Sequence, residues 1–290
     1  AVKNRGYLLK KDAVPDVMTV PEIISRLHSR WMGRNCIFLE TVDSTNNYAK
    51  TLPDLSLPQL VVSEEQTAGR GRLGRSFYSP AGKGIYMSFA FCPRLELSQA
   101  MLVTTMTAVA VCRALESLTG LRPKIKWVND IYLNEKKLCG ILTEAETNFE
   151  TGEIQKIIVG IGINCFEDAA MPPELREVAT FLDKPQESFD RNALIAAIAN
   201  EFFDMLAHFD RAKIVRDYRA RSFILGQQIL IFNPAIARAI GRPDNRLSEG
   251  IRARAIDIDE NGGLVVEYLE GTKSRQMETL STGEITVRKV

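Results

Sequence analysis

The sequence predicts an α+β protein in which a central sheet packed with helices is followed by a small β-barrel. Three observations predict this fold class. Apolar strand-like runs alternate with long helical segments between residues 31 and 225. The run 154–165 has almost no polar face, as expected of a central strand buried on both sides. Beyond Gly226 the chain changes to short strands separated by turns, the pattern of a small β-barrel.

The first predicted elements are short. Residues 1–20 are polar and strand-like at best, and a helix is expected from Val20 to about Arg30. The run 36–40 predicts a strand. The polar residues that follow it can cap a helix through their side-chain oxygens, which alone would explain Ser44 and Thr45. Residues 60–63 then predict the strand that leads into a glycine-rich loop.

The loop at residues 66–76, QTAGRGRLGRS, is the most informative segment because it joins three glycines to three arginines. Glycine lets a backbone approach a ligand closely, and each guanidinium offers a planar fork of donors for carboxylate or phosphate oxygens. The glycine spacing approaches both the dinucleotide fingerprint and the P-loop, but both need a helix immediately afterwards. Residues 85–91 instead predict a strand. The loop is therefore predicted to hold an anion between two strands, with an ordinary basic surface loop as the alternative.

Two later segments predict buried helices, and the C-terminal region predicts short strands. Residues 98–118 are apolar nearly all round, as in a helix that crosses one face of a sheet. Residues 190–221 have apolar side chains at helical spacing, which indicates core packing and no catalytic role. After Gly226, strands are expected at 228–232, 250–258, 263–268 and 284–290, with a hairpin turn at Asn261-Gly262 and an exposed loop at 233–248.

Polar residues gather around a predicted hairpin. Residues 123–130 begin a strand, residues 134–137 make a tight turn, and residues 138–142 return beside it. Each polar side chain here has a plain explanation as a solvated turn residue. Together, however, the glycine loop, Lys137 and the strand end at Asn164 could converge at one end of the sheet, where ligands commonly bind. Such a set would suit phosphate chemistry.

The composition restricts the classes of function. With 37 Lys and Arg against 36 Asp and Glu, the chain has no global basic field to favour nonspecific nucleic-acid binding. Five scattered cysteines without metal-ligand spacing indicate a reduced, cytoplasmic protein. Two histidines support neither a histidine-centred triad nor a histidine-rich metal site, so the chemistry must rest on Lys, Arg, Asp and Asn. No apolar run reaches the ~20 residues of a membrane span, and no signal-peptide core is present.

Taken together, these residues resemble those of a known family, the biotin protein ligases. Six motifs occur in the family's order and approximate spacing: DSTN at 43–46, QTAGRGRLGR at 66–75, SP at 79–80, KWVND at 126–130, KLCGIL at 137–142 and GIGIN at 160–164. The resemblance covers about residues 38–290 and is far more specific than the glycine pattern alone. The chain departs from the family at Val128, where proline is usual, and at Cys139, where a small residue such as alanine is common. Both departures leave the polar positions intact.

The resemblance implies a fold, a domain division and a reaction. The fold would be a class II synthetase-like domain with a central mixed sheet packed with helices, followed by an SH3-like β-barrel. Residues 1–30 would be the remnant of an N-terminal wing and its linker helix, residues 31–225 the catalytic domain that binds biotin and ATP, and residues 226–290 the barrel. The enzyme would use the substrates biotin and ATP, with Mg²⁺, to form biotinyl-5'-AMP. It would then transfer biotin to a lysine of a biotin carboxyl carrier protein domain. The metal ligands are not identified.

The resemblance also implies roles for individual residues. Lys137, Arg72 and Arg70 would be catalytic, because cations that neutralise carboxylate and phosphate charge lower the barrier. The biotin-binding set would comprise Ser44, Thr45, Asn46, Gln66, Gly69, Arg70, Arg72, Lys137 and Gly140. The ATP-binding set would comprise Arg72, Arg75, Phe77, Asn129, Asp130, Asn164, Glu284 and Arg288. The arginine loop is expected to become ordered when ligand binds.

Three alternatives stay open. A lipoate ligase shares the fold and an acyl-adenylate route, but its paired arginines with a glycine run and a histidine are absent from this sequence. A biotin-sensing repressor would need a winged helix; residues 4–8 resemble the last strand of a wing, but no recognition helix is present and the chain begins at Ala1, as a truncation upstream would leave it. DNA binding is therefore not expected from this chain alone. A module that only binds biotinyl-adenylate is disfavoured by the retained cations. A homodimer through a sheet edge is a family expectation, and no membrane partner is expected.

Overall fold

The structure, a computed structural model, describes residues 16–28, 35–53, 55–92, 100–148, 150, 153–182, 189–233, 236, 249–281 and 286–289. The wing-like segment 4–8 and most of the predicted loop 233–248 lie outside these residues.

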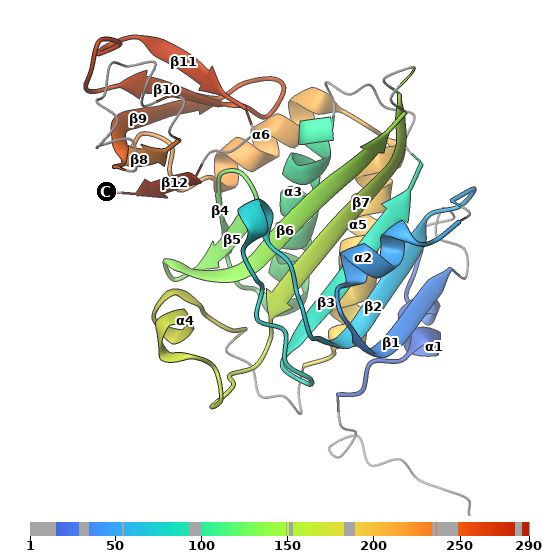
Figure 1. Cartoon of the computed structure of the whole chain (residues 1–290). Helices are drawn as coiled ribbons and strands as arrows, with labels where there is room; N and C mark the ends of the chain where they lie inside the picture. Colours follow the sequence, from blue (N-terminus) through green and yellow to red (C-terminus); the bar gives the residue numbers. More distant parts are fainter. Residues whose placement is uncertain are drawn as a thin grey trace, which may run out of the picture.

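A seven-stranded mixed sheet forms the centre of the molecule, in the order β1-β2-β3-β7-β6-β5-β4 (Figure 1). Its strands are β1 Cys36–Val42, β2 Gln59–Gln66, β3 Gly84–Phe91, β4 Lys124–Lys126, β5 Asp130–Leu133, β6 Lys136–Thr147 and β7 Ile154–Asn164. The pair β1 and β2 is parallel, and the other neighbours are antiparallel. The expected central position of β7 is confirmed, because this strand pairs with β3 on one side and with β6 on the other.

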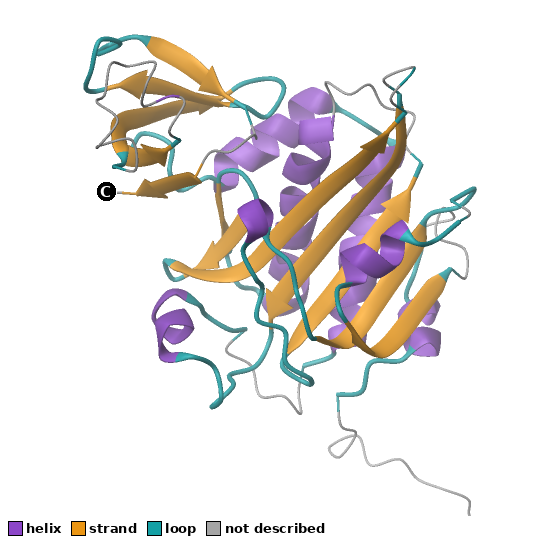
Figure 2. Cartoon of the chain, in the orientation of Figure 1, coloured by secondary structure: helices purple, strands orange, loops and turns teal. Residues whose placement is uncertain are grey.

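Helices cover the two faces of this sheet unequally (Figures 1 and 2). Behind it lie α3 Ala100–Thr119, α5 Arg191–Ala207 and α6 Arg211–Arg221. In front, α2 Thr45–Lys50 packs over β2, β3 and β7. Two further short helices are α1 Val20–Ser25, which packs on α5, and α4 Pro173–Val178, which packs beside β6. The front of the sheet is thus left to α2 and to the loop between β2 and β3 (Figure 2).

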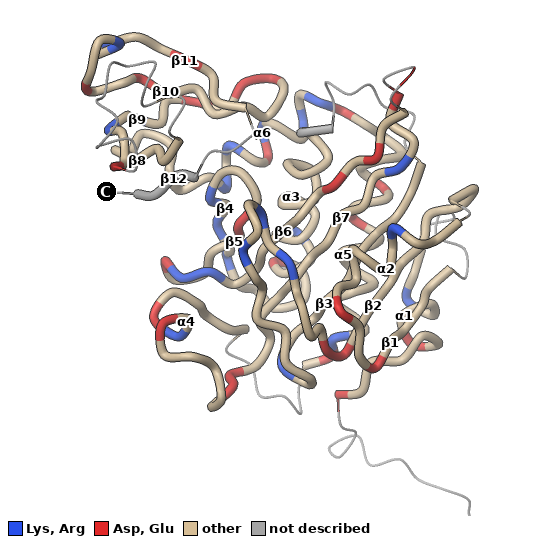
Figure 3. Tube along the Cα trace, in the orientation of Figure 1, with Lys and Arg blue, Asp and Glu red and all other residues tan. Residues whose placement is uncertain are grey.

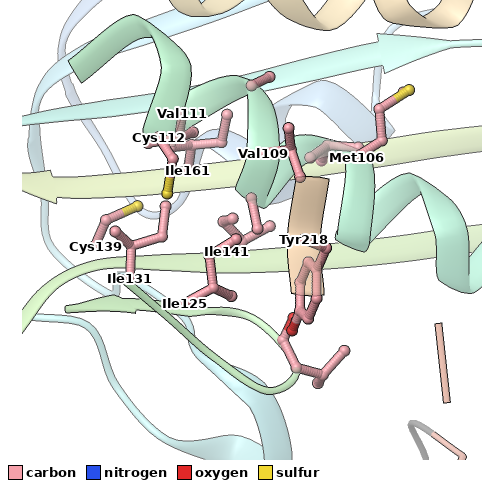
Figure 4. Close-up of a cluster of buried hydrophobic side chains, with 14 of the residues drawn as sticks. Met106, Val109, Val111, Cys112, Ile125, Ile131, Cys139, Ile141, Ile161 and Tyr218 are labelled. Carbon is pink, nitrogen blue, oxygen red and sulfur yellow. The ribbon is translucent and has the colours of Figure 1, made fainter. Parts of the chain in front are cut away.

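The core lies between the sheet and the helices behind it. Figure 4 shows Met106, Val109 and Cys112 of α3 in the same cluster as strand residues such as Ile141 and Ile161. Among the helices of the described residues, α3 alone is long and apolar enough over Leu102–Thr119 to cross a membrane by length and composition. That stretch is 72% buried inside the protein, so it is a core helix, as its apolar sequence predicted.

A second, five-stranded antiparallel sheet forms the C-terminal region, in the order β11-β10-β9-β8-β12. Its strands are β8 Gln228–Phe232, β9 Ile251–Ile258, β10 Leu264–Tyr268, β11 Met277–Leu280 and β12 Thr286–Lys289. The turn between β9 and β10 contains Gly262, whose φ of 85° suits the predicted Asn-Gly hairpin. This turn contacts the first sheet, because Trp127 Nε1 donates to Gly262 O at 3.0 Å.

Three predicted elements differ from the observed ones. Helix α1 ends at Ser25 rather than near Arg30, and its C-cap residue Arg26 donates its backbone N–H to Ile23 O. The strand expected to begin over residues 123–130 is two antiparallel strands, β4 and β5, joined by a turn at 127–129. The next turn is only two residues, Asn134 and Glu135, both with positive φ, so Lys136 and Lys137 already belong to β6.

Candidate active site

A cavity of about 140 Å³ opens on the front of the main sheet. It lies between α2, the loop after β2, the β4–β5 turn and the middle of β6 and β7. Twelve of the predicted site residues line it: Ser44, Thr45, Asn46, Gln66, Arg70, Arg72, Arg75, Phe77, Asn129, Asp130, Lys137 and Gly140. The structure therefore brings together segments that are up to about a hundred residues apart in the sequence.

The glycine–arginine loop is closed by its own backbone. Gly71 N donates to Arg75 O at 2.7 Å, and Phe77 N donates to Gly69 O at 2.8 Å. Between these bonds the chain turns with positive φ at Leu73 (58°) and Gly74 (72°). Glycine adopts this conformation without the steric penalty that a β-carbon brings. The loop thus places Arg72 at its inner side and Phe77 at its exit, while its ordering on ligand binding stays a prediction.

Arg72 is held at the cavity by Asn129. Its Nη1 donates to Asn129 Oδ1 at 3.2 Å, and Asn129 Nδ2 donates to Ile141 O at 2.6 Å. Burial lowers the pKa of the Arg72 guanidinium, the carboxylate of Asp130 opposes that shift, and the charge of Arg75 adds to it. Burial removes part of the water that would stabilise the charge of this guanidinium, and Arg75 repels it. A bound anion would stabilise that charge in place of the water, so the site favours anions.

Lys137 faces the same space from β6. Its Nζ lies 2.6 Å from Asp130 Oδ1, so the ammonium is kept in the cavity by a carboxylate of β5. The backbone of Lys137 is fixed as well, since its carbonyl accepts from Thr180 N at 2.9 Å and from Asn164 Nδ2 at 3.4 Å. Figure 3 shows basic positions along the loop after β2 and near the β5–β6 turn.

Glycines give the ring of Phe77 its place on the sheet. A β-carbon on Gly162 would lie 2.5 Å from Phe77 Cε1, and one on Gly140 would lie 3.3 Å from Phe77 Cε2 and 3.2 Å from Lys137 Nζ. Gly69 is tight for another reason: its β-carbon would lie 2.4 Å from Phe77 O and 2.6 Å from Ser79 Oγ. Two strand glycines and one loop glycine therefore set how close Phe77 comes to the sheet.

The opposite wall is the polar start of α2. Ser44 occupies the N-cap position of this helix, but its side chain makes no capping hydrogen bond, so capping does not explain this residue. Gln66 Oε1 accepts from Thr45 N at 2.9 Å and lies 3.2 Å from Thr45 Oγ1. Gln66 Nε2 donates to Ser79 Oγ at 2.9 Å. The buried side chains of Thr45 and Ser79 and the half-buried Gln66 thus form a continuous hydrogen-bonded wall.

The remaining predicted residues lie elsewhere. Asn164 and Gly69 do not line the cavity and support Lys137 and the loop, respectively. Glu284 lies outside the described residues, and of Arg288 only the backbone, in β12, is described. The prediction missed Trp127, Gly160 and Gly162, which line the cavity. All three belong to motifs already recognised in the sequence, so the signal was present.

Two family models match this chain. Residues 38–164 match the biotin/lipoate A/B protein ligase family, and residues 246–288 match the biotin protein ligase C-terminal domain. The chain is 34% identical over 277 residues to the bifunctional ligase/repressor BirA of Bacillus subtilis, which covers 94% of this chain and 81% of that protein. The chain belongs to the biotin protein ligase family. A second relative is the biotin–[acetyl-CoA-carboxylase] ligase of Paracoccus denitrificans. It is 32% identical to this chain over 255 residues, which cover 82% of this chain and 95% of the relative.

Solved structures of biotin protein ligases share the fold. The enzyme of Aquifex aeolicus in complex with biotin and ATP aligns with a TM-score of 0.70 and 27% identity, over 88% of this chain and 99% of that one. The enzyme of Leishmania major in complex with biotinyl-5-AMP aligns with a TM-score of 0.56 and 25% identity, over 86% and 99% of the two chains.

Proposed function

We propose that this biotin protein ligase activates biotin as biotinyl-5'-AMP and transfers it to a lysine of a biotin carboxyl carrier protein domain. The observation that carries the proposal is the gathering of Arg70, Arg72 and Lys137 around one cavity whose opposite wall is neutral and hydrogen-bonded. Two anions, a carboxylate and a triphosphate, repel each other, and fixed cations reduce that repulsion most where charge develops. The neutral wall suits the uncharged ring system of biotin.

The first step would join the two substrates. A carboxylate oxygen of biotin attacks the α-phosphorus of ATP, and the bond to pyrophosphate breaks with its electron pair on the leaving group. Lys137 and Arg72 stand on facing sides of the cavity, on β6 and on the loop, so both can contact the reacting oxygens. Because they are already placed, they need little reorganisation during the reaction.

The second step would consume the adenylate. The amine of a carrier lysine attacks the carboxyl carbon, the carbon–oxygen bond to AMP breaks with its electron pair on the phosphate, and the amine gives up a proton to the carboxylate of Asp130 as the amide forms. Asp130 supplies a carboxylate to the lining of the cavity. Its ion pair with Lys137 would hold that carboxylate close to the reacting carbon. The closed loop over the cavity would limit hydrolysis of the mixed anhydride by water.

Phe77, Asn129 and Arg75 line the part of the cavity that we assign to ATP. Glu284 and Arg288 stay proposals on resemblance alone. The site offers few protein ligands for Mg²⁺. Among the described residues no group of three His, Cys, Asp or Glu side chains could hold a metal ion, but Asp130 offers one carboxylate. Mg²⁺ is commonly bound through one or two carboxylates together with substrate phosphates, and it would neutralise phosphate charge here.

The acceptor, the assembly and the domain division belong to the same proposal. A lipoate ligase is the nearest alternative, and the match of residues 246–288 to a biotin protein ligase C-terminal domain favours biotin. We propose a carboxylase carrier domain as acceptor, a homodimer through a sheet edge, a cytoplasmic location and no DNA binding by this chain alone. We also propose a division of the chain into an N-terminal segment 1–30, a catalytic domain 31–225 and a barrel 226–290.

Exchange of labelled pyrophosphate into ATP, dependent on biotin, tests the first step. Lys137→Ala and Arg72→Ala are expected to abolish exchange while thermal unfolding stays cooperative. Lys136→Ala is the matched control, because the neighbouring Lys136 is exposed and donates to Arg176 O at 3.3 Å, away from the cavity. Exchange at the native rate in Lys137→Ala would refute the assignment.

A further inference from the structure

A hydrogen bond between Tyr78 and Asp168 joins the glycine–arginine loop to the segment that follows β7. Tyr78 comes directly after Phe77 at the exit of the loop. Its phenol Oη donates to Asp168 Oδ2 at 2.6 Å, although the two residues are 90 positions apart in the sequence. A hydrogen bond of this length to a carboxylate is charge-assisted, a kind that is roughly twice as strong as a neutral one.

Asp168 is itself held in place as an acceptor. Its second oxygen, Oδ1, accepts from Ala170 N at 3.0 Å, and its backbone carbonyl accepts from Met171 N at 3.1 Å. The hydrogen bond from Tyr78 is the largest cause that lowers the pKa of Asp168, and the same bond raises the pKa of Tyr78. The carboxylate is therefore charged and the phenol protonated at neutral pH, as the donation requires.

The segment that carries Asp168 also fixes the backbone of Lys137. It closes on itself where Leu182 N donates to Cys165 O at 3.2 Å. Near its end, Ala179 forms a parallel bridge with Lys137, and Thr180 N donates to Lys137 O at 2.9 Å. The carboxylate that receives the Tyr78 hydroxyl thus belongs to the same closed segment as the amide that holds a proposed catalytic cation.

On the loop side, Tyr78 stands between two residues that are bonded to different neighbours. Phe77 N donates to Gly69 O at 2.8 Å, within the loop itself. Ser79 is bonded twice to Gln66, through its carbonyl at 3.0 Å and its Oγ at 2.9 Å. The wall assigned to biotin therefore keeps its own bonds, whereas the Tyr78 hydroxyl adds a bond to the segment after β7 one residue from Phe77.

We propose that Tyr78 and Asp168 are positioning residues, whose hydrogen bond fixes the ring of Phe77 relative to Lys137 so that the nucleotide meets the reacting cation in the right geometry. The inference rests on the proposed function, because Phe77 lines the part of the cavity that we assign to ATP. The link between the two side chains passes through Tyr78, Asp168 and Thr180.

Tyr78→Phe tests the link because it removes the hydroxyl and keeps the ring. In biotin-dependent pyrophosphate exchange, the KM for ATP should rise about three- to tenfold, the effect of one lost hydrogen bond at a half-buried site. The kcat and the Kd of biotin should stay within about twofold, since the biotin wall keeps its bonds. A loss of folded protein would instead lower the apparent kcat and leave the KM unchanged.

Two substitutions of Asp168 separate the link from the side chain itself. Asp168→Ala should match Tyr78→Phe, and the double variant should show no further loss. Asp168→Asn keeps the link: its amide oxygen can accept from Ala170 N, and its NH₂ group can donate to the phenol oxygen. The KM of this variant should stay within about twofold of the native value. Tyr48→Phe is the matched control, because the Tyr48 hydroxyl on α2 makes no hydrogen bond to any described residue.

Amide hydrogen exchange of the full chain without substrates tests the link independently of activity. Tyr78→Phe should speed exchange about three- to tenfold at both Phe77 N and Thr180 N, whereas Tyr48→Phe should change neither.

A raised KM that Asp168→Asn avoids, together with faster amide exchange at both positions, supports the inference. A native KM in Tyr78→Phe, an equal loss in Asp168→Asn and Asp168→Ala, or native protection of Phe77 N overturns it. If the native protein shows no biotin-dependent pyrophosphate exchange, the proposed function falls and the role in the reaction with it, whereas amide exchange still decides whether the bond links the two segments.

Discussion

Gly162→Ala is the substitution whose effect the geometry defines most closely. The added β-carbon would lie 2.5, 2.7 and 2.9 Å from Cε1, Cζ and Cδ1 of Phe77. Carbon atoms in contact are ordinarily about 3.5–4.0 Å apart, so the ring has to move by about 1 Å. Gly162 is in the interior of β7, paired with Gly140 and Tyr86, and strand neighbours on both sides limit any movement of the backbone. The ring of Phe77, at the end of a loop, is the part that moves.

Two magnitudes follow from that displacement. Overpacking of this kind costs about 1–3 kcal/mol of folding free energy, which a cooperative domain can tolerate. A displacement of about 1 Å at a reacting site can reduce the rate about 100-fold, because the reacting groups no longer meet in line. We therefore expect Gly162→Ala to remain folded and to lose about 10- to 100-fold in kcat/KM for ATP in biotin-dependent pyrophosphate exchange.

A matched control and a rescue variant separate this effect from general damage. Gly71→Ala adds a methyl group in the same cavity, where its nearest neighbour, Arg75 O, is 3.4 Å away, and should stay within a few-fold of native exchange. Adding Phe77→Leu to Gly162→Ala removes the collision and should recover part of the native stability. Native exchange kinetics in a folded Gly162→Ala protein would refute the placement of Phe77 at the ATP end of the site.

Three other predictions concern polar groups inside the fold. Arg191→Met should lower the free energy of unfolding in urea by about 3–5 kcal/mol, because it leaves the buried carboxylate of Asp16 without its guanidinium; a loss below about 1 kcal/mol would contradict this. Burial would raise the pKa of Glu144, but hydrogen bonds from its donors lower it overall, so its contribution to stability is present above about pH 4.3, the usual glutamate value, and is lost as the pH falls through the lower folded pKa. The Tm difference between the native protein and Glu144→Gln should accordingly shrink on acidification, and a difference that grows would be the wrong sign. Trp127→Phe removes the donor to Gly262 O at 3.0 Å and should lower the stability by about 1 kcal/mol, measured by thermal unfolding; an unchanged Tm would show that this link between the two sheets is not needed.

The elements with strong periodicity could be predicted from the sequence, and those set by distant contacts could not. The helix α3 is apolar nearly all round and the strand β7 is apolar from Ile157 to Ile163, so the sequence pattern of each indicated a buried element. Strand β11, Met277–Leu280, is four residues long with a polar centre, and it is defined by pairing with β10 rather than by its own sequence. The break between β4 and β5 is likewise invisible in KWVND, because it depends on how the two strands pair.

The site residues also divide into those that a sequence motif reveals and those that only distant contacts bring to the site. The cations and glycines that line the cavity stand in motifs, so resemblance located Arg72, Lys137 and Gly140 without any structure. Glu144 and Ser88 were not singled out in the sequence, because each hydrogen-bonds to α2 from a distance in the chain, Glu144 to Asn46 over about a hundred residues and Ser88 to Thr45 over about forty. An ordinary Glu in a strand and an ordinary Ser in a buried run have no distinguishing pattern in a single sequence. Only the order of the sheet, in which β3 and β6 flank β7, and the position of α2 over it bring them beside Thr45 and Asn46.

The most direct test of the account is transfer to a carrier. The native chain would be incubated with ATP, Mg²⁺, biotin and an apo biotin carboxyl carrier domain, with lipoate as the parallel acid, and the carrier analysed by mass spectrometry. The proposed function predicts a biotinyl mass increase on one carrier lysine, dependent on ATP and absent with lipoate. A lipoylated carrier, or an unmodified carrier despite tight binding of biotin, would contradict it.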